Sequence, residues 1–182
     1  FQVRLENLVL DYSHLKLDEH MLNKLLEIYN EKNVAGKFED MYNGKIINQT
    51  ESRKVLHVAL RNSSLEKHEE VNDVLNKISK FTEDIRTGKK LGFTGKKLKN
   101  FISIGIGGSY LGADFVYNAL KDHSEYAKLS SGLTLRFLAN VCPIDFKRAT
   151  DGLDPEETLV IIISKTFTTK ETILNAETVR NW

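Results

Sequence analysis

The sequence has few cysteines and prolines and no long hydrophobic run. Its single cysteine, Cys142, excludes an internal disulfide and favours a reducing compartment such as the cytoplasm. No apolar run approaches the roughly 20 residues that a membrane-spanning helix requires, and the first residues lack a secretory signal pattern. We therefore expect a cytoplasmic protein without a membrane partner.

The sequence also lacks a large excess of positive or negative charge. The chain has 26 basic and 25 acidic residues and a net charge of +1, so nothing indicates a nucleic-acid partner. Basic residues form one local cluster, which we expect to be a solvated loop face: Lys89, Lys90, Lys96, Lys97 and Lys99.

The length and composition fit one domain or slightly more. The chain has 182 residues, of which 41% are hydrophobic, enough for a packed core. It begins with Phe1 rather than Met, so we expect it to be part of a longer chain.

Residues 1–90 are predicted to form a mostly helical region. The apolar periodicity predicts an extended segment at 1–12 and helices over 18–29, 34–42, 51–60 and 66–86, with a break at Asn62-Ser63-Ser64. The apolar stripe of helix 66–86 is expected to be core. We also expect His57 to face a packed interior and Thr50 to be a helix N-cap.

From residue 100 onward, strands and helices alternate. The pattern predicts strands at 101–105, 133–139 and 158–164, with helices at 109–120, near 144–149 and from 169 onward. Five consecutive apolar residues in the third strand are typical of a central parallel strand covered on both faces. The fold class is therefore α/β, a doubly wound parallel sheet in residues 91–182 preceded by the helical region 1–90. Three strands are few for such a sheet, so we expect other residues to complete this domain.

The strand–helix region is organised around residues 102–112, ISIGIGGSYLG. An apolar strand ends in glycines, and a helical pattern begins after Ser109. Glycines allow a sharp turn or a close approach to a ligand, and a helix N-terminus suits an anion such as phosphate. Taken alone, these glycines fit a close-packed turn equally well.

A second turn, SKTFTT at 164–169, makes an anion site more plausible. Its hydroxyl groups, Lys165 and the start of a helix can together bind a phosphate dianion. Thr168 and Glu171 also fit a capping box, which would explain those two residues but not the whole cluster. Ligands of open α/β sheets bind at the carboxyl ends of strands, where both turns are predicted to lie.

Two nucleotide-binding motifs fail on specific residues. A dinucleotide fingerprint starting at Gly105 requires glycine where the chain has Tyr110, and no acidic residue ends the second strand. A P-loop starting at Gly92 lacks the required spacing, the hydroxyl and the preceding strand. A plain α/β interaction module would leave the hydroxyl cluster unexplained.

Several separated motifs, in order, resemble the phosphoglucose isomerase family. The family's I-G-I-G-G-S matches 104–109, S-K-T-F-T-T matches 164–169, and E-T-I-x-N-A-E-T matches 171–178. The segment 41–62 and the turn Gly92-Phe93-Thr94-Gly95-Lys96 also match the family pattern. The resemblance covers most of the chain from about residue 35.

This resemblance implies a sugar-isomerase domain with a flavodoxin-like fold. It also implies interconversion of glucose 6-phosphate and fructose 6-phosphate through an enediol, in glycolysis and gluconeogenesis, by a homodimer without metal or organic cofactor. Glu171 would hold a supporting position. The residues implied to bind the substrate phosphate are Gly108, Ser109, Ser164, Lys165, Thr166 and Thr169.

The resemblance leaves the acid–base chemistry outside this chain. In the family, the base glutamate, the ring-opening histidine and a further lysine lie downstream, and none of His14, His20, His57, His68 and His123 matches them. The segment alone is therefore expected to bind sugar phosphate weakly and to catalyse nothing. A non-catalytic sugar-phosphate sensor is the alternative, although the match at 56–62 favours the isomerase.

Two positions depart from the family pattern. Lys170 stands where relatives commonly have Gln or Ala, and it adds a charge beside the phosphate turn or simply faces solvent. Cys142 stands where relatives often have Asp, in a loop where little depends on it.

Overall fold

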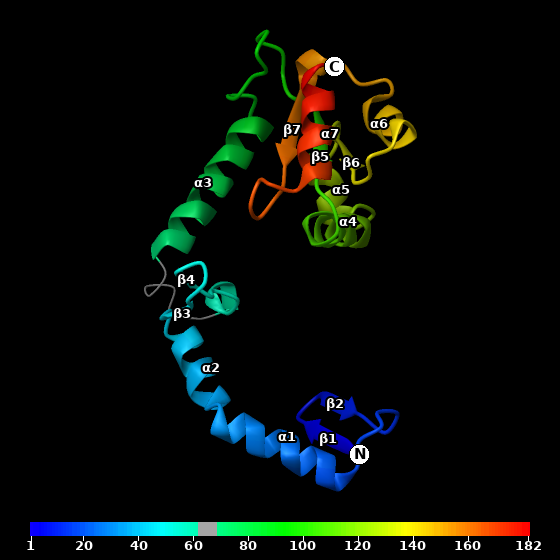
Figure 1. Ribbon diagram of the computed structural model, residues 1–182. Coiled ribbons are helices and arrows are strands. Elements are labelled where there is room, and N and C mark those ends of the chain that lie inside the picture. Colours follow the sequence, from blue (N-terminus) through cyan, green and yellow to red (C-terminus); the bar gives the residue numbers. More distant parts are fainter. Residues whose placement is uncertain (62–68) are drawn as a thin grey trace. The chain divides into compact units, whose positions relative to one another are not determined.

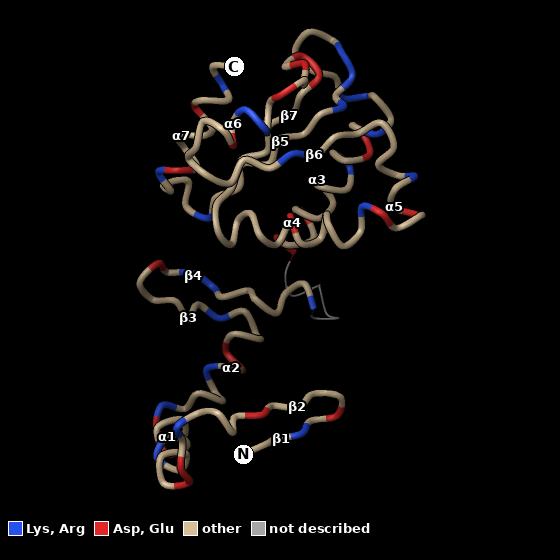
Figure 2. The backbone as a smooth tube through the Cα atoms, turned by 90° about the vertical axis from the view of Figure 1, so that its right-hand side faces the viewer, with Lys and Arg blue, Asp and Glu red and all other residues tan. Residues whose placement is uncertain are grey.

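The computed structural model describes residues 1–61 and 69–182, and its chain divides into two compact units, Phe1–Asn76 and Lys77–Trp182. The expected break at Asn62-Ser63-Ser64, the expected helix start at Glu66 and His68 lie outside the described residues. Acidic and basic residues are interspersed along both units (Figure 2). No helix in the described ranges is long and apolar enough to cross a membrane.

The first unit combines two β-hairpins with helices (Figure 1). The predicted extended segment is confirmed as an antiparallel hairpin of β1 (Gln2–Leu5) and β2 (Leu8–Asp11). The predicted helices at 18–29 and 34–42 are confirmed as α1 (Glu19–Glu31) and α2 (Val34–Tyr42). Asp18 and Asn33 cap them, because their side chains accept hydrogen bonds from Met21 N (2.7 Å) and Gly36 N (3.2 Å).

The predicted helix at 51–60 is wrong. This segment holds β4 (Arg53–Lys54), which pairs with β3 (Ile46–Asn48), followed by a short 3₁₀ turn at Ala59–Arg61. Thr50 caps no helix, because its hydroxyl donates to Asn48 Oδ1 (2.9 Å), and the same oxygen accepts from Glu51 N (3.2 Å). This local side-chain turn competes with helix formation. His57 is exposed rather than packed inside a core.

The apolar stripe predicted to be core is mostly exposed. In α3 (Glu69–Arg86) only Ile85 is buried, whereas Val74 and Ile78 are each 53% exposed. Helix periodicity therefore identified an apolar face correctly, but most of that face is exposed.

The second unit is built on a three-stranded parallel sheet. These strands, β5 (Asn100–Ile104), β6 (Thr134–Leu138) and β7 (Thr158–Ile162), confirm the three predicted ones. The central strand is β5, with β6 and β7 parallel on either side. The strand predicted at 158–164 lies at the edge of the described sheet, and its Ile161 and Ile162 are 40% and 38% exposed, so the second neighbour and full cover expected for it are not found among the described residues.

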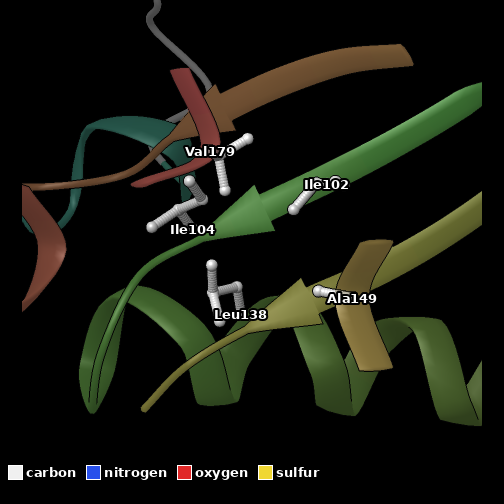
Figure 3. Packing of buried hydrophobic residues seen from close by; sticks show 5 residues of the cluster. All are labelled: Ile102, Ile104, Leu138, Ala149 and Val179. Atoms are coloured by element: carbon white, nitrogen blue, oxygen red, sulfur yellow. The ribbon is translucent and has the colours of Figure 1, made fainter. Parts of the chain in front are cut away.

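Helices lie on both faces of this sheet. On one face Ile102, Ile104 and Leu138 pack against Ala149 and Val179 (Figure 3). These last two residues come from α6 (Pro143–Thr150) and α7 (Lys170–Arg180). On the other face α4 (Gly108–Leu120) places Tyr110 and Tyr117 edge-on against Phe137 of β6, and a short α5 (Ser124–Leu129) follows. This is a mixed α/β architecture with helical cover on both sides of its parallel strands.

The lysine-rich loop before β5 is partly paired rather than fully solvated. Lys96 Nζ lies 2.9 Å from Asp154 and 2.5 Å from Glu156, and Lys99 Nζ lies 2.8 Å from Glu157. The carboxylates of Glu156 and Asp154 raise the pKa of Lys96 above 10.5, and Lys96 lowers the pKa of Asp154 below 3.8. These pairs attach the loop to the short 3₁₀ turn at Pro155–Glu157 that leads into β7.

Candidate functional site

The sheet register brings the two predicted turns to the same edge. Ile104 at the end of β5 pairs with Ile162 of β7, and Ile163 N donates to Ile104 O (2.8 Å). The glycine turn begins at Gly105 and the hydroxyl turn at Ser164, so both leave the carboxyl ends of adjacent parallel strands. This is the position at which open α/β sheets bind ligands.

The glycine turn requires glycine at Gly105 for lack of space and favours it at Gly107 because of the backbone conformation. A Cβ added at Gly105 would lie 2.5 Å from the carbonyl oxygen of Ser109, and Gly107 has a φ of 54°, which suits glycine. Gly107 is the N-cap of α4 and, because it has no side chain, it does not cap the first N–H groups of the helix. Gly108 and Ser109 are therefore the first residues of this helix, with Gly108 exposed and Ser109 half-buried. The structure thus places them where an anion would meet the N-terminus of α4.

The hydroxyl turn is held together by its own hydrogen bonds. Ser164 Oγ accepts from Phe167 N (3.0 Å), and Phe167 has a φ of 53°, an uncommon value for a bulky residue. The hydroxyls of Thr166 and Thr168 are 2.7 Å apart and form a hydrogen bond. The turn therefore has a defined shape in which several hydroxyls gather before α7.

The capping box considered for Thr168 and Glu171 is absent. The N-cap of α7 is Thr169, which makes no side-chain cap, and the Thr168 hydroxyl bonds to Thr166 instead. The hydroxyls of this turn consequently do not serve helix capping. Lys165, Lys170 and Glu171 are exposed around the same helix N-terminus, so its charges are of both signs.

A third turn, after β6, belongs to the same edge and was missed from the sequence. Asp145 Oδ2 accepts from the backbone N–H groups of Ala139 (3.1 Å) and Asn140 (3.0 Å). Asn175 Nδ2 of α7 donates to the carbonyl of Asn140 (3.3 Å). The available signal was a polar residue, Asn175, on the same helical face as the buried Val179.

Cys142 lies at the junction of this third turn and α6. It is the N-cap of α6, it is exposed, and it makes no side-chain cap. Its backbone N–H donates to the carbonyl of Asn140 (3.0 Å), so its main chain helps to close the turn.

The described histidines, none of which matches an acid–base residue of the family, are not buried. The histidines His14, His20, His57 and His123 are exposed, and His123 pairs its ring with Tyr126 at 5.1 Å. Within residues 1–61 and 69–182, no three His, Cys, Asp or Glu side chains cluster as metal ligands.

Comparison with known proteins agrees with the motifs at this edge. The family model described as phosphoglucose isomerase matches residues 11–182. The chain is 48% identical to a cytosolic glucose-6-phosphate isomerase 1 of Clarkia arcuata and 46% identical to a cytosolic glucose-6-phosphate isomerase of Spinacia oleracea, in both cases over 99% of this chain. The chain spans about a third of the length of these relatives, 33% in each case. A match over residues 11–182 is far more than half of the chain, and we conclude that it belongs to the phosphoglucose isomerase family.

Proposed function

We propose that the protein carrying this chain interconverts glucose 6-phosphate and fructose 6-phosphate, and that the chain supplies the phosphate-binding part of the site. The observation that carries this proposal is the pair of anion-suited turns that leave adjacent strands, β5 and β7, at one edge. The relatives named cytosolic glucose-6-phosphate isomerase support it. The reaction would then serve glycolysis and gluconeogenesis in the cytoplasm.

The phosphate would bind between the two helix N-termini. The side chains of the hydroxyl turn are short and held in place, because the Phe167 N–H orients the Ser164 hydroxyl and the hydroxyls of Thr166 and Thr168 bond to each other. The N-terminal dipoles of α4 and α7 favour a dianion, and a lysine adds a point charge. The proposed ligands are Gly108, Ser109, Ser164, Lys165, Thr166 and Thr169.

The contribution of this chain to catalysis would be position. Aldose–ketose isomerisation moves a proton between C2 and C1 and requires a carboxylate base near those carbons and groups that open the ring. Fixing the phosphate orients the sugar carbons, which can contribute up to about 7–11 kcal/mol in ideal cases. Glu171, one residue into α7, would play a supporting part. The base and the ring-opening group would come from the remainder of the protein.

The proposed function also implies how the protein is organised around the site. Residues 91–182 would be the first part of a doubly wound, flavodoxin-like sugar-isomerase domain, with residues 1–90 as a region preceding it. The remainder of the protein would complete the sheet beside β7, and two subunits would form a homodimer.

The test follows fructose 6-phosphate by NMR with the protein at the full length of its relatives. Appearance of glucose 6-phosphate is expected. The double variant Ser164→Ala/Thr166→Ala should raise KM by about tenfold or more, because it removes two ligand hydroxyls that each contribute on the order of 1 kcal/mol. Thr178→Ala is the matched control, since its hydroxyl donates to Leu174 O within α7 (2.8 Å). Binding without conversion would instead indicate a sugar-phosphate sensor.

A further inference from the structure

Asn175 is a buried polar residue that the proposed phosphate site does not use. It lies on α7, is 7% exposed, and shares its buried helix face with Thr172 and Val179. A buried amide is costly unless it is hydrogen-bonded. Its Nδ2 donates to the carbonyl of Asn140, a residue 35 positions earlier in the chain (3.3 Å). Asn175 thus connects α7 to the turn after β6.

The opposite side of that turn is held by a different helix. Asp145 of α6 accepts from the N–H groups of Ala139 and Asn140, at 3.1 and 3.0 Å. Asn140 is therefore held through its N–H by α6, and its carbonyl accepts both from Asn175 of α7 and from Cys142 N of its own turn (3.0 Å). A turn held by several hydrogen bonds has a fixed position, so it can fix the position of the helix that bonds to it.

The anchored helix is the one that begins at the hydroxyl turn. Asn175 lies five residues beyond the start of α7 at Lys170, or about 7.5 Å along the axis at 1.5 Å per residue. The apolar contact of Val179 with Ile102 and Ile104 holds the helix on the sheet, but apolar packing is non-directional. The hydrogen bond is directional, so it sets the rotation of the helix and its position along the axis.

We propose that Asn175 is a positioning residue for the phosphate site. Its bond to the Asn140 carbonyl fixes the N-terminus of α7, and with it Ser164–Thr169, relative to the glycine turn after β5. The amide does not touch the substrate in this proposal. The inference rests on the proposed function, because it concerns the same phosphate site.

The test compares two buried polar residues of α7 in the protein at the full length of its relatives. Asn175→Asp keeps the size of the side chain but replaces the donor with an acceptor, and Asn175→Ala removes it. Thr172→Val is the control, since Thr172 is 2% exposed on the same helix face. KM for fructose 6-phosphate is expected to rise about 2- to 10-fold in both Asn175 variants, the effect of one hydrogen bond. In the same variants kcat should stay within about twofold, the signature of lost uniform binding.

A second readout separates positioning from mere stability. The inhibition constant of inorganic phosphate should rise by the same factor as KM. In the Ser164→Ala/Thr166→Ala background the Asn175→Asp effect should shrink, because residues that act through one site are not additive. A purely structural residue would lower the melting temperature without this coupling.

The outcomes distinguish the two proposals. Wild-type protein that neither isomerises nor binds sugar phosphate refutes the proposed function and the inference together. Isomerisation with an unchanged KM in the Asn175 variants overturns the inference alone. An equal rise of KM in Thr172→Val also overturns it, because general packing of α7 would then explain the effect. If Asn175→Asp does not fold, Asn175→Ala decides the question.

Discussion

Gly105 and Gly112 lie in the same glycine-rich stretch but have different surroundings. An alanine Cβ at Gly105 would lie 2.5 Å from a backbone oxygen, that of Ser109, which cannot move without shifting the start of α4. We expect Gly105→Ala to lower the free energy of unfolding by about 1–3 kcal/mol, as overpacking does. Chemical denaturation of the protein at the full length of its relatives measures this change.

Gly112 provides the matched control for that substitution. It lies inside α4, and a Cβ there meets no atom within 4 Å. Gly112→Ala should raise the free energy of unfolding by about 0.5–1 kcal/mol, because alanine loses less backbone entropy in a helix. Equal stability of Gly105→Ala and wild type would contradict the close-approach argument.

At the residue scale, the sequence predicted the residues whose role in a turn or at a helix start depends on their own chemical type. The glycines at 105 and 107 and the hydroxyls at 164 and 166 were identified because turns and helix starts require particular residue types. Asp145 and Asn175 were missed because their partners are backbone groups of the turn after β6. A backbone carbonyl has no sequence signature, so only the fold can show that Asn175 meets Asn140.

At the scale of elements, the period and length of the apolar pattern predicted the strands of the parallel sheet correctly. They failed where a short side-chain turn competes with helix formation. The strand–helix alternation after residue 100 was correct in all three strands. The helix predicted over 51–60 failed because the Asn48 side chain closes a turn with Thr50 and Glu51. The apolar content of β7 predicted neighbours on both sides of this strand, whereas the described sheet pairs it with β5 on one side. The burial of a strand depends on the elements beside it, and the residues of the strand itself do not predict which elements those are.

The lysine loop before β5 should respond to acid through its ion pairs. Lys96 lowers the pKa of Asp154 below 3.8, so the pair stabilises the loop above that pH and the stabilisation is lost as the pH falls below it. The raised pKa of Lys96 keeps its amine charged up to at least pH 10.5, so on the alkaline side the stabilisation is lost only above that pH. Lys96→Met should therefore raise the pKa of Asp154 toward 3.8.

A carboxyl-detected NMR titration of Asp154 checks this shift. Lys97→Met is the control, because it removes one positive charge from the same loop next to Lys96. Equal shifts in both variants would mean that general charge, rather than the pair, sets the pKa of Asp154.

At the scale of the whole molecule, each unit leaves large apolar side chains exposed. In the first unit Leu25 and Leu26 of α1 are 52% and 50% exposed, and in the second unit Leu111 and Phe115 of α4 are 60% and 73% exposed. Contiguous exposed apolar surface in a protein usually marks a region that another surface covers. The chain spans 33% of the relatives' length, and in a protein of that full length we expect further residues to cover part of these faces.

The 182-residue chain expressed alone should therefore behave differently from the protein at the full length of its relatives. We expect it to bind a hydrophobic dye such as ANS strongly, because the apolar faces of α1 and α4 lack cover. It should show no isomerase activity, because the base and the ring-opening group are proposed to come from the remainder of the protein, and Asp145 already accepts hydrogen bonds from backbone N–H groups. Fructose 6-phosphate turnover followed by NMR, alongside dye fluorescence, makes the measurement. Turnover by the isolated chain would mean that the base lies within these residues, and Glu171 would then be the first side chain to substitute.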